Sequence, residues 1–385
     1  MKVGSLLRWL AIAVLAAIAA GEIGLRVVPR SIVPQLRLLD RVYGARSAWT
    51  QMMTGDPYLG YKLKPGLDID FPSEGRRIPF RTNSYGLDGI GFRDLGNQPP
   101  FRMVAVGGSF TVCDDVPAEA CWVRRLADSL NSSAVTLAAN GYSTLAAART
   151  LARYGSHFGG KLVLVEVHPN DFRDNATFER WSRTGDDNFW EWLAFQRGRT
   201  PWVQWLGRNS MIFRLIDGSS RGLHRLIYSY NQDGLDLVFR LDTWFLSVVR
   251  NGERHAGWPL TQLSLQQLRN TARSQGAEMM AVLFPTKEQA YWQRVKPMAP
   301  ADIAPIIDRP IELVADYCRQ QGLHCCDLRP ALRQHAATTE QIFHRISAHP
   351  NDLGHAVVAE AVEECLRDQA LIDQIQNEPP GGPPA

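Results

Sequence analysis

The chain has 385 residues, of which 45% are hydrophobic, and this is enough apolar surface to bury a large core in one domain or two. Its 42 basic and 39 acidic residues leave a net charge of +3, and the positive charges form no dense block. This balance argues against nucleic acid as a partner and favours a solvated surface of mixed sign.

An apolar segment lies near the start of the chain. Residues 6–28 have about the length of a membrane-spanning helix, with basic residues at the beginning. The triplet Ala17-Ile18-Ala19 also has the small-x-small form of a signal-peptide cleavage site, and a buried soluble helix is a third interpretation. Of these three interpretations, we favour a membrane anchor formed by residues 1–28, because the apolar surface is continuous and lies at the N-terminus.

Two features disagree about the side of the membrane on which the rest of the chain lies. The arginines that follow the span favour the cytoplasm by the positive-inside rule. They are Arg26, Arg30, Arg37, Arg41 and Arg46. The six cysteines show close pairs and no zinc-binding spacing, which is typical of disulfides in an oxidising compartment, although six buried thiols remain an alternative. We give the cysteines more weight and predict a single-pass protein of the inner membrane whose large domain is exported to the periplasm.

The cysteine positions also predict one particular disulfide. Cys113 and Cys121 are close in sequence, and in an exported chain we expect them to be joined. The pairing among the other four is left open. They are Cys318, Cys325, Cys326 and Cys365.

Secondary structure changes character along the chain. Turn residues recur over residues 29–98 and predict an irregular juxtamembrane segment. From 99 to 375, buried strands alternate with amphipathic helices. The predicted strands cover residues 101–106, 134–140, 161–167, 277–285 and 323–328. Five strands separated by helices predict an α/β domain of three layers, α/β/α, with a parallel sheet covered on both faces.

One insertion interrupts this alternation. Residues 171–257 are predicted to form a helical segment rich in tryptophan, either as a cap over a site or packed around its own core. Its tryptophans are Trp181, Trp190, Trp192, Trp202, Trp205 and Trp244. The last ten residues, 376–385, are rich in proline and glycine and predict a disordered tail.

Polar residues follow three of the predicted strands, at the sheet edge where ligands bind. Ser109 ends the first strand, Gly141 the second and Asn170 the third, while His349 precedes the last helix. A histidine can take the proton of a serine hydroxyl and make it a nucleophile. Backbone N–H groups at Ser109 and Gly141 and the Asn170 amide are suitable donors to an oxyanion. Alone, each feature is common, but together they predict acyl transfer.

The blocks that carry these residues resemble those of the SGNH (GDSL-type) hydrolases. "GGSFT", "NGYST", "HPND" and "HPNDLGH" occur in the order of that family and span about residues 99 to 367. "DPYLGYKLKP", "NSYGLDGIGFRD" and "FPTKEQAYW" look like the membrane-anchored bacterial branch. The resemblance implies a flavodoxin-like fold, Ser109 as nucleophile, His349 as general base, and Gly141 with Asn170 in the oxyanion hole.

The sequence departs from the family pattern in the third and fourth blocks. His168 stands where the family has glycine, and we consider it a candidate substrate contact, with helix entry or packing as the alternative. The aspartate that precedes the catalytic histidine is missing, because Ile346 and Ser347 occupy its positions. The His349 ring is then oriented by Ser347, a backbone carbonyl or an acid from elsewhere.

Lys287, after the fourth strand, is a second candidate substrate contact, with a surface lysine as the alternative. The resemblance predicts a serine-dependent esterase or O-acyltransferase that moves an acyl group, acetyl in our interpretation, on an envelope glycan or small ester. No metal or organic cofactor is implied. The alternative is a catalytically degenerate domain that binds glycans, which the missing aspartate would explain.

Overall fold

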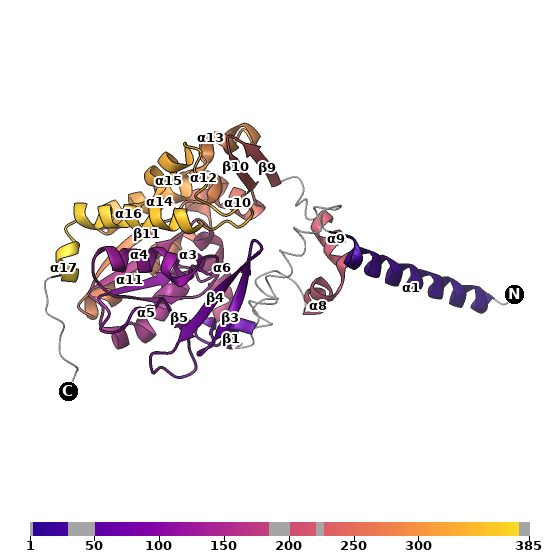
Figure 1. Cartoon of the computed structure of the whole chain (residues 1–385), viewed down its shortest axis with the longest axis horizontal. Helices are drawn as coiled ribbons and strands as arrows, with labels where there is room; N and C mark the ends of the chain where they lie inside the picture. Colours follow the sequence, from indigo (N-terminus) through magenta and orange to yellow (C-terminus); the bar gives the residue numbers. More distant parts are fainter. Residues whose placement is uncertain (1–2, 30–50, 185–200, 221–226, 377–385) are drawn as a thin grey trace. The chain divides into compact units, whose positions relative to one another are not determined.

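A computed structural model of the chain describes most of its residues (Figure 1). The described residues are 3–29, 51–184, 201–220 and 227–376. They fall into two compact units, which we describe separately. The first combines residues 1–52 with 193–226, and the second combines 53–192 with 227–385.

The first unit contains the apolar N-terminal helix. α1 (Val3–Val27) includes a stretch, Arg8–Val27, with a mean hydropathy of 2.0 and no buried residue, so by length and composition it can cross a membrane. The unit also contains α8 (Pro201–Asn209) and α9 (Met211–Ser220). Glu22 connects α1 to α9, because its carboxylate accepts hydrogen bonds from the backbone N–H groups of Met211 (2.7 Å) and Ile212 (3.2 Å) at the start of α9.

The second unit is built on a five-stranded parallel sheet, as the sequence predicts. Its strands are β6 (Met103–Gly107), β7 (Ala134–Ala138), β8 (Leu162–Val167), β11 (Glu278–Leu283) and β12 (His324–Asp327). They lie in the order β12-β11-β8-β6-β7. Largely apolar and β-branched residues form β6, β7 and β8, which are buried along their whole length.

Helices connect these strands and complete the three layers. The chain runs from β6 to β7 in one direction and from β7 to β8, β11 and β12 in the other. Because such crossovers are right-handed, the first helix covers one face and the following three cover the opposite face. These helices are α4 (Trp122–Ser129), then α5 (Thr144–Phe158), α11 (Trp258–Ser274) and α14 (Arg309–Gln321). The helix α16 (Asp352–Asp368), near the C-terminus, packs against α4.

The strand order places the expected ligand edge. The chain order changes direction at β6 and β8, and ligands of such sheets bind at the carboxyl ends of the strands at this switch point. Ser109 follows Gly108 at the end of β6, and Asn170 lies after β8 at the start of α6 (Asn170–Ser182). Two residues predicted from different sequence blocks therefore lie at the same switch point.

The expectation of irregular structure before the α/β domain is wrong for residues 53–93. Short strands lie there, and they belong to the same compact unit as the sheet. Their apolar residues alternate over only a few positions between turns, which hides the period in the sequence. β1 (Met53–Asp56) pairs with β2 (Gly60–Leu63), while β3 (Asp68–Ser73), β4 (Arg76–Asn83) and β5 (Phe92–Arg93) form an antiparallel sheet.

The insertion is also not wholly helical. After α9 it contains an antiparallel hairpin, β9 (Ile227–Gln232) and β10 (Leu235–Arg240), followed by α10 (Thr243–Asn251). Trp181 is buried, whereas Trp202 and Trp205 on α8 are exposed, so a shared tryptophan core is not present among the described residues. Trp190, Trp192 and most of the predicted tail lie outside the described residues.

The remaining elements are short, and two disulfides join parts of the second unit. Cys113 bonds Cys121 as predicted, and Cys326 bonds Cys365, which links β12 to α16. The other helices are α3 (Ser109–Val112), α12 (Lys287–Ala290), α13 (Trp292–Val295), α15 (Arg329–Ala336) and α17 (Ile372–Gln376).

Candidate active site

Ser109 is the first residue of α3, immediately after two glycines that the surrounding structure requires. A Cβ on Gly107, whose φ is +155°, would lie 2.4 Å from the Cβ of Glu166. A Cβ on Gly108 would lie 2.7 Å from the carbonyl oxygen of Tyr142. The glycine pair therefore lets β6 turn into α3 over the buried Glu166 side chain and leaves the serine at the sheet edge.

The buried side chain of Glu166 stabilises this turn through a hydrogen bond to α3. Its Oε2 accepts a hydrogen bond from the backbone N–H of Thr111 in α3, at 2.8 Å. Burial raises the pKa of Glu166 to about 7, although bonds from Thr111 act in the opposite direction. This contact could not be predicted from the sequence, because Glu166 lies within an otherwise apolar strand.

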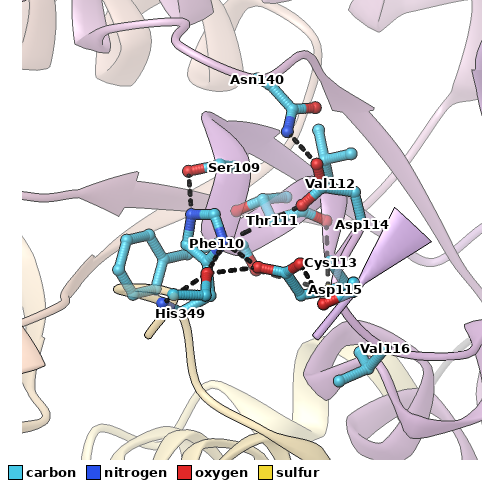
Figure 2. A network of polar contacts seen from close by, with 12 residues as sticks. Ser109, Phe110, Thr111, Val112, Cys113, Asp114, Asp115, Val116, Asn140 and His349 are labelled. Carbon is cyan, nitrogen blue, oxygen red and sulfur yellow. Dashed lines mark hydrogen bonds and ion pairs between the residues drawn. The ribbon is translucent and has the colours of Figure 1, made fainter. Parts of the chain in front are cut away.

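The His349 ring lies between a hydroxyl and a carboxylate (Figure 2). Its Nε2 is 2.8 Å from Ser109 Oγ, and its Nδ1 is 2.6 Å from Asp115 Oδ2. Burial alone would lower the pKa of His349, but the hydrogen bond and charge of Asp115 raise it above its usual value. Burial likewise raises the pKa of Asp115, but the bond and charge of His349 outweigh this effect and leave that pKa well below its usual range.

Asp115 therefore occupies the position of the acid that the histidine block lacks. It comes from the loop after the nucleophile and not from the residues before His349. Ser347, the candidate for orienting the ring, donates from its Oγ to Asp115 Oδ2 at 2.5 Å and lies 3.3 Å from His349 Nδ1. The structure thus brings Ser347 to the site, and its contact with Asp115 is shorter than its contact with His349.

A second acid lies beside this pair. Asp114 Oδ1 is 4.0 Å from His349 Nδ1, and Asp114 accepts a hydrogen bond from the side-chain amide of Asn140. Burial and the neighbouring Asp115 carboxylate raise the pKa of Asp114 to about 6. Asp114, Asp115 and His349 also have the spacing of a metal-binding group, with ligand atoms within 4.8 Å of one another. Because both nitrogens of His349 bond within the serine–histidine–aspartate arrangement, we interpret the group as a triad and its flanking acid.

The loop that carries the acids is held from two directions. Arg93, at the end of β5, is buried and donates to the backbone carbonyls of Val112 (2.9 Å), Val116 (2.7 Å) and Cys113. The disulfide between Cys113 and Cys121 closes the same loop. A buried guanidinium that bonds three carbonyls on either side of two acids fixes the backbone from which Asp115 points.

The predicted oxyanion donors Gly141 and Asn170 follow β7 and β8, the two strands that flank β6. Gly141 follows β7 and has a φ of +77°, and a Cβ there would lie 2.9 Å from the hydroxyl of Tyr61. Asn170 Oδ1 is 2.7 Å from His168 Nδ1. Burial lowers the pKa of His168 to about 3, so its ring is neutral at physiological pH. The same ring nitrogen accepts the backbone N–H of Asn170 at 3.3 Å, so His168 contacts both the side chain and the backbone of Asn170.

The two candidate substrate contacts are both buried. His168 stacks on Phe110, with ring centroids 4.8 Å apart, and orients the Asn170 amide. Lys287 is 1% exposed, and its Nζ donates to the carbonyls of His344 (3.3 Å), Arg345 (3.2 Å) and Ser347 (3.0 Å). We therefore interpret Lys287 as holding the loop before His349, a role that its position after strand β11 did not reveal.

A family comparison agrees with the motifs. Residues 242–380 match the family described as "SGNH hydrolase-like domain, acetyltransferase AlgX". This match confirms the predicted resemblance to the SGNH hydrolases, and it does not test the resemblance to a membrane-anchored branch. None of the curated proteins matches the sequence.

Solved structures with similar folds are distant in sequence. TesA matches with 12% identity and a TM-score of 0.38, over 69% of this chain and 98% of its own. The esterase EstA from Pseudoalteromonas sp. matches with 11% identity and a TM-score of 0.38, over 70% and 98%. A catalytic mutant of Axe2, an acetylxylan esterase from Geobacillus stearothermophilus, matches with 12% identity and a TM-score of 0.34, over 69% and 92%.

Proposed function

We propose that the protein is a serine-dependent O-acyltransferase or ester hydrolase that moves an acetyl group on an envelope glycan. The observation that carries this proposal is the chain of contacts from Ser109 Oγ through His349 to Asp115, at 2.8 and 2.6 Å. A serine, a histidine and a carboxylate in this order form the general machinery of acyl transfer. The acetyltransferase description of the matched family supports acetyl as the acyl group.

The geometry supports a two-step reaction. Ser109 Oγ attacks the ester carbonyl while His349 Nε2 takes its proton, and the oxyanion forms near Gly141 and Asn170. The ester C–O bond then breaks, the leaving alkoxide takes the proton from His349, and the acyl group stays on Ser109. In the second step His349 takes a proton from water or a sugar hydroxyl, and the oxygen of that group attacks the acyl carbon. The bond from the acyl carbon to Ser109 Oγ then breaks, and His349 returns the proton to Ser109 Oγ. Asp115 stabilises the imidazolium in both steps.

The alternative of a catalytically degenerate binding domain loses its main support. That alternative depended on the missing acid, and Asp115 lies at hydrogen-bond distance from the ring nitrogen where such an acid acts. A protein that only binds glycans requires neither this contact nor a serine hydroxyl at 2.8 Å from the other ring nitrogen. We therefore retain the catalytic proposal.

We expect a fluorophosphonate probe to label the purified full-length chain at Ser109, because an activated serine attacks phosphorus as it attacks a carbonyl. The second step is tested with p-nitrophenyl acetate as the acetyl donor and a deacetylated polysaccharide as the acceptor. If the enzyme transfers the acetyl group, adding the polysaccharide should increase the release of p-nitrophenol, and the polysaccharide should become acetylated. Mass spectrometry of the labelled peptide and of the polysaccharide provides the readout. Release of acetate unchanged by the acceptor would assign hydrolysis, and absence of both labelling and release would contradict the proposal.

We also propose that α1 anchors the protein in a membrane, with the catalytic unit on the oxidising side. The two disulfides support the exported location. On α8, Trp202 and Trp205 are 64% and 61% exposed, and tryptophan is enriched at membrane–water interfaces. α9 connects to α1 through Glu22, near the C-terminal end of the apolar stretch. We therefore place α8 in the interface beside the span.

Spin labels on the full chain in liposomes test this placement. Nitroxides at Leu15→Cys and Trp205→Cys should be accessible to oxygen and protected from a water-soluble nickel chelate, because both positions contact lipid. A label at Leu263→Cys, an exposed apolar position of the catalytic unit, is the matched control and should behave in the opposite way. All three variants carry Cys325→Ser to remove the half-buried free thiol. If the label at position 205 is exposed to water while the label at position 15 faces lipid, the placement of α8 in the interface is contradicted and the anchor is not. If both labels are exposed to water, the proposal that α1 is a membrane anchor is contradicted.

A further inference from the structure

The tip of the β3–β4 hairpin contacts both loops that supply the proposed catalytic acid and base. We call residues 73–76 the hairpin tip and residues 344–349 the histidine loop. The acid and the base are far apart in sequence, at Asp115 and His349, and each lies in a loop outside the regular elements. Their 2.6 Å contact therefore requires something that fixes one loop relative to the other.

The first contact of the hairpin tip is with the acid. Ser73 is 2% exposed, and its hydroxyl donates to Asp115 Oδ1 at 2.5 Å. The other oxygen of the same carboxylate accepts from His349 and from Ser347. Ser73 thus satisfies the oxygen that the histidine does not use, and this fixes the rotation of the carboxylate plane.

The second contact is with the backbone of the histidine loop. Glu74 Oε2 accepts from the N–H of Arg345 at 2.8 Å, and Glu74 Oε1 accepts from the N–H groups of Ile346 (2.6 Å) and Ser347 (2.8 Å). Lys287 bonds carbonyls of the same loop. A carboxylate on the N–H groups and an ammonium on the carbonyls together hold the loop backbone two residues before His349.

The turn itself uses an unfavourable residue at the position that makes these contacts. Glu74 has a φ of +46° and Gly75 a φ of +85°, between paired residues Ser73 and Arg76. A two-residue loop with both φ values positive is a type I′ turn, which favours asparagine, aspartate or glycine at its first central position. Glutamate is disfavoured in this conformation, so local turn stability does not account for it. Its longer side chain accounts for the reach to the histidine loop.

We propose that the hairpin tip, through Ser73 and Glu74, is a positioning element that sets the acid and the histidine loop of the active site in register. This inference rests on the proposed function, because it assigns the tip a role in acyl-serine chemistry. Neither residue touches the reacting atoms. The hairpin belongs to the segment before the α/β sheet, so the inference also makes that segment a functional part of the enzyme.

The test compares Glu74→Gln with Glu74→Asn in the full-length chain. Both remove the carboxylate, but asparagine restores the preferred residue of a type I′ turn and glutamine does not. Both variants should lower kcat and the rate of fluorophosphonate labelling by about 10- to 100-fold with little change in KM, since a misplaced base costs this much. The Tm of Glu74→Asn should stay at or above that of Glu74→Gln, so that activity and stability separate.

Two further variants complete the test. Ser73→Ala should lower kcat in the same direction, because Asp115 loses the donor to its free oxygen. Arg77→Gln, on the same hairpin with a side chain that is 82% exposed, is the control and should leave both rate and Tm unchanged. Wild-type rates in both Glu74 variants, or losses of activity that follow Tm across the pair, would overturn the positioning role. Failure of the wild type to label at Ser109 would instead contradict the proposed function.

Discussion

Ser109→Ala and His349→Ala are each expected to reduce kcat by roughly 10⁵- to 10⁶-fold, and the double variant should be hardly slower than either single variant. The hydroxyl and the imidazole act as one unit, because the serine is a weak nucleophile without the base 2.8 Å away. Initial rates of p-nitrophenyl acetate cleavage measure the loss. Asn170→Ala should retain more activity and cost about 2.7–4 kcal/mol in transition-state stabilisation, the value of one oxyanion donor.

Residues of the same types outside the candidate site serve as controls for these variants. Ser274→Ala, at the exposed C-terminal end of α11, and His335→Ala, at a half-buried position of α15, should keep wild-type rates. Circular dichroism of each variant separates loss of chemistry from loss of fold. Full activity in Ser109→Ala, on any ester that the wild type cleaves, would overturn the assignment of the nucleophile.

Asp115→Asn is expected to lower kcat by about 10⁴-fold, because an asparagine neither stabilises the imidazolium nor selects the correct tautomer of His349. Asp114→Asn is the matched comparison. Its carboxylate lies 4.0 Å from the same ring nitrogen and bonds Asn140, so we expect a smaller loss. Ser347→Ala should also cost less than Asp115→Asn, since Ser347 donates to the acid at 2.5 Å while the acid itself bonds the ring. Equal losses in Asp114→Asn and Asp115→Asn would contradict the choice of acid.

The pH profile provides an independent measure of the same contact. His349 accepts a proton only when it is neutral, so activity falls as the pH drops through its pKa. Asp115 raises that pKa. Removing the charge in Asp115→Asn lowers it, and the residual activity should extend to lower pH than in the wild type. An acid limb that stays in place or moves to higher pH would show that another group controls the titration of His349.

The sequence predicted the elements that follow regular rules. The parallel strands have apolar runs of the right length, and parallel topology brings their ends together, so Ser109, Gly141 and Asn170 could be predicted to lie at one sheet edge without a structure. Asp115 was missed because its partner is distant in sequence and no spacing connects the two. The two adjacent acids of "VCDDV", enclosed by a predicted disulfide, were the available signal. The strands of residues 53–93 were missed because turns separate them too closely for a period to emerge.

The disulfide that closes the loop of Asp114 and Asp115 has a consequence for the compartment in which the proposed enzyme becomes active. Cys113 precedes Asp114 and Asp115 directly, and its bond to Cys121 forms only where thiols are oxidised. A newly synthesised chain in a reducing cytosol lacks this restraint on the loop, since glutathione keeps such thiols reduced. We expect the enzyme to mature after export, when oxidation fixes the loop. Acetyl esters and acyl donors inside the cell would then meet only the immature form, and a cell that loses its disulfide-forming machinery would accumulate enzyme of low activity.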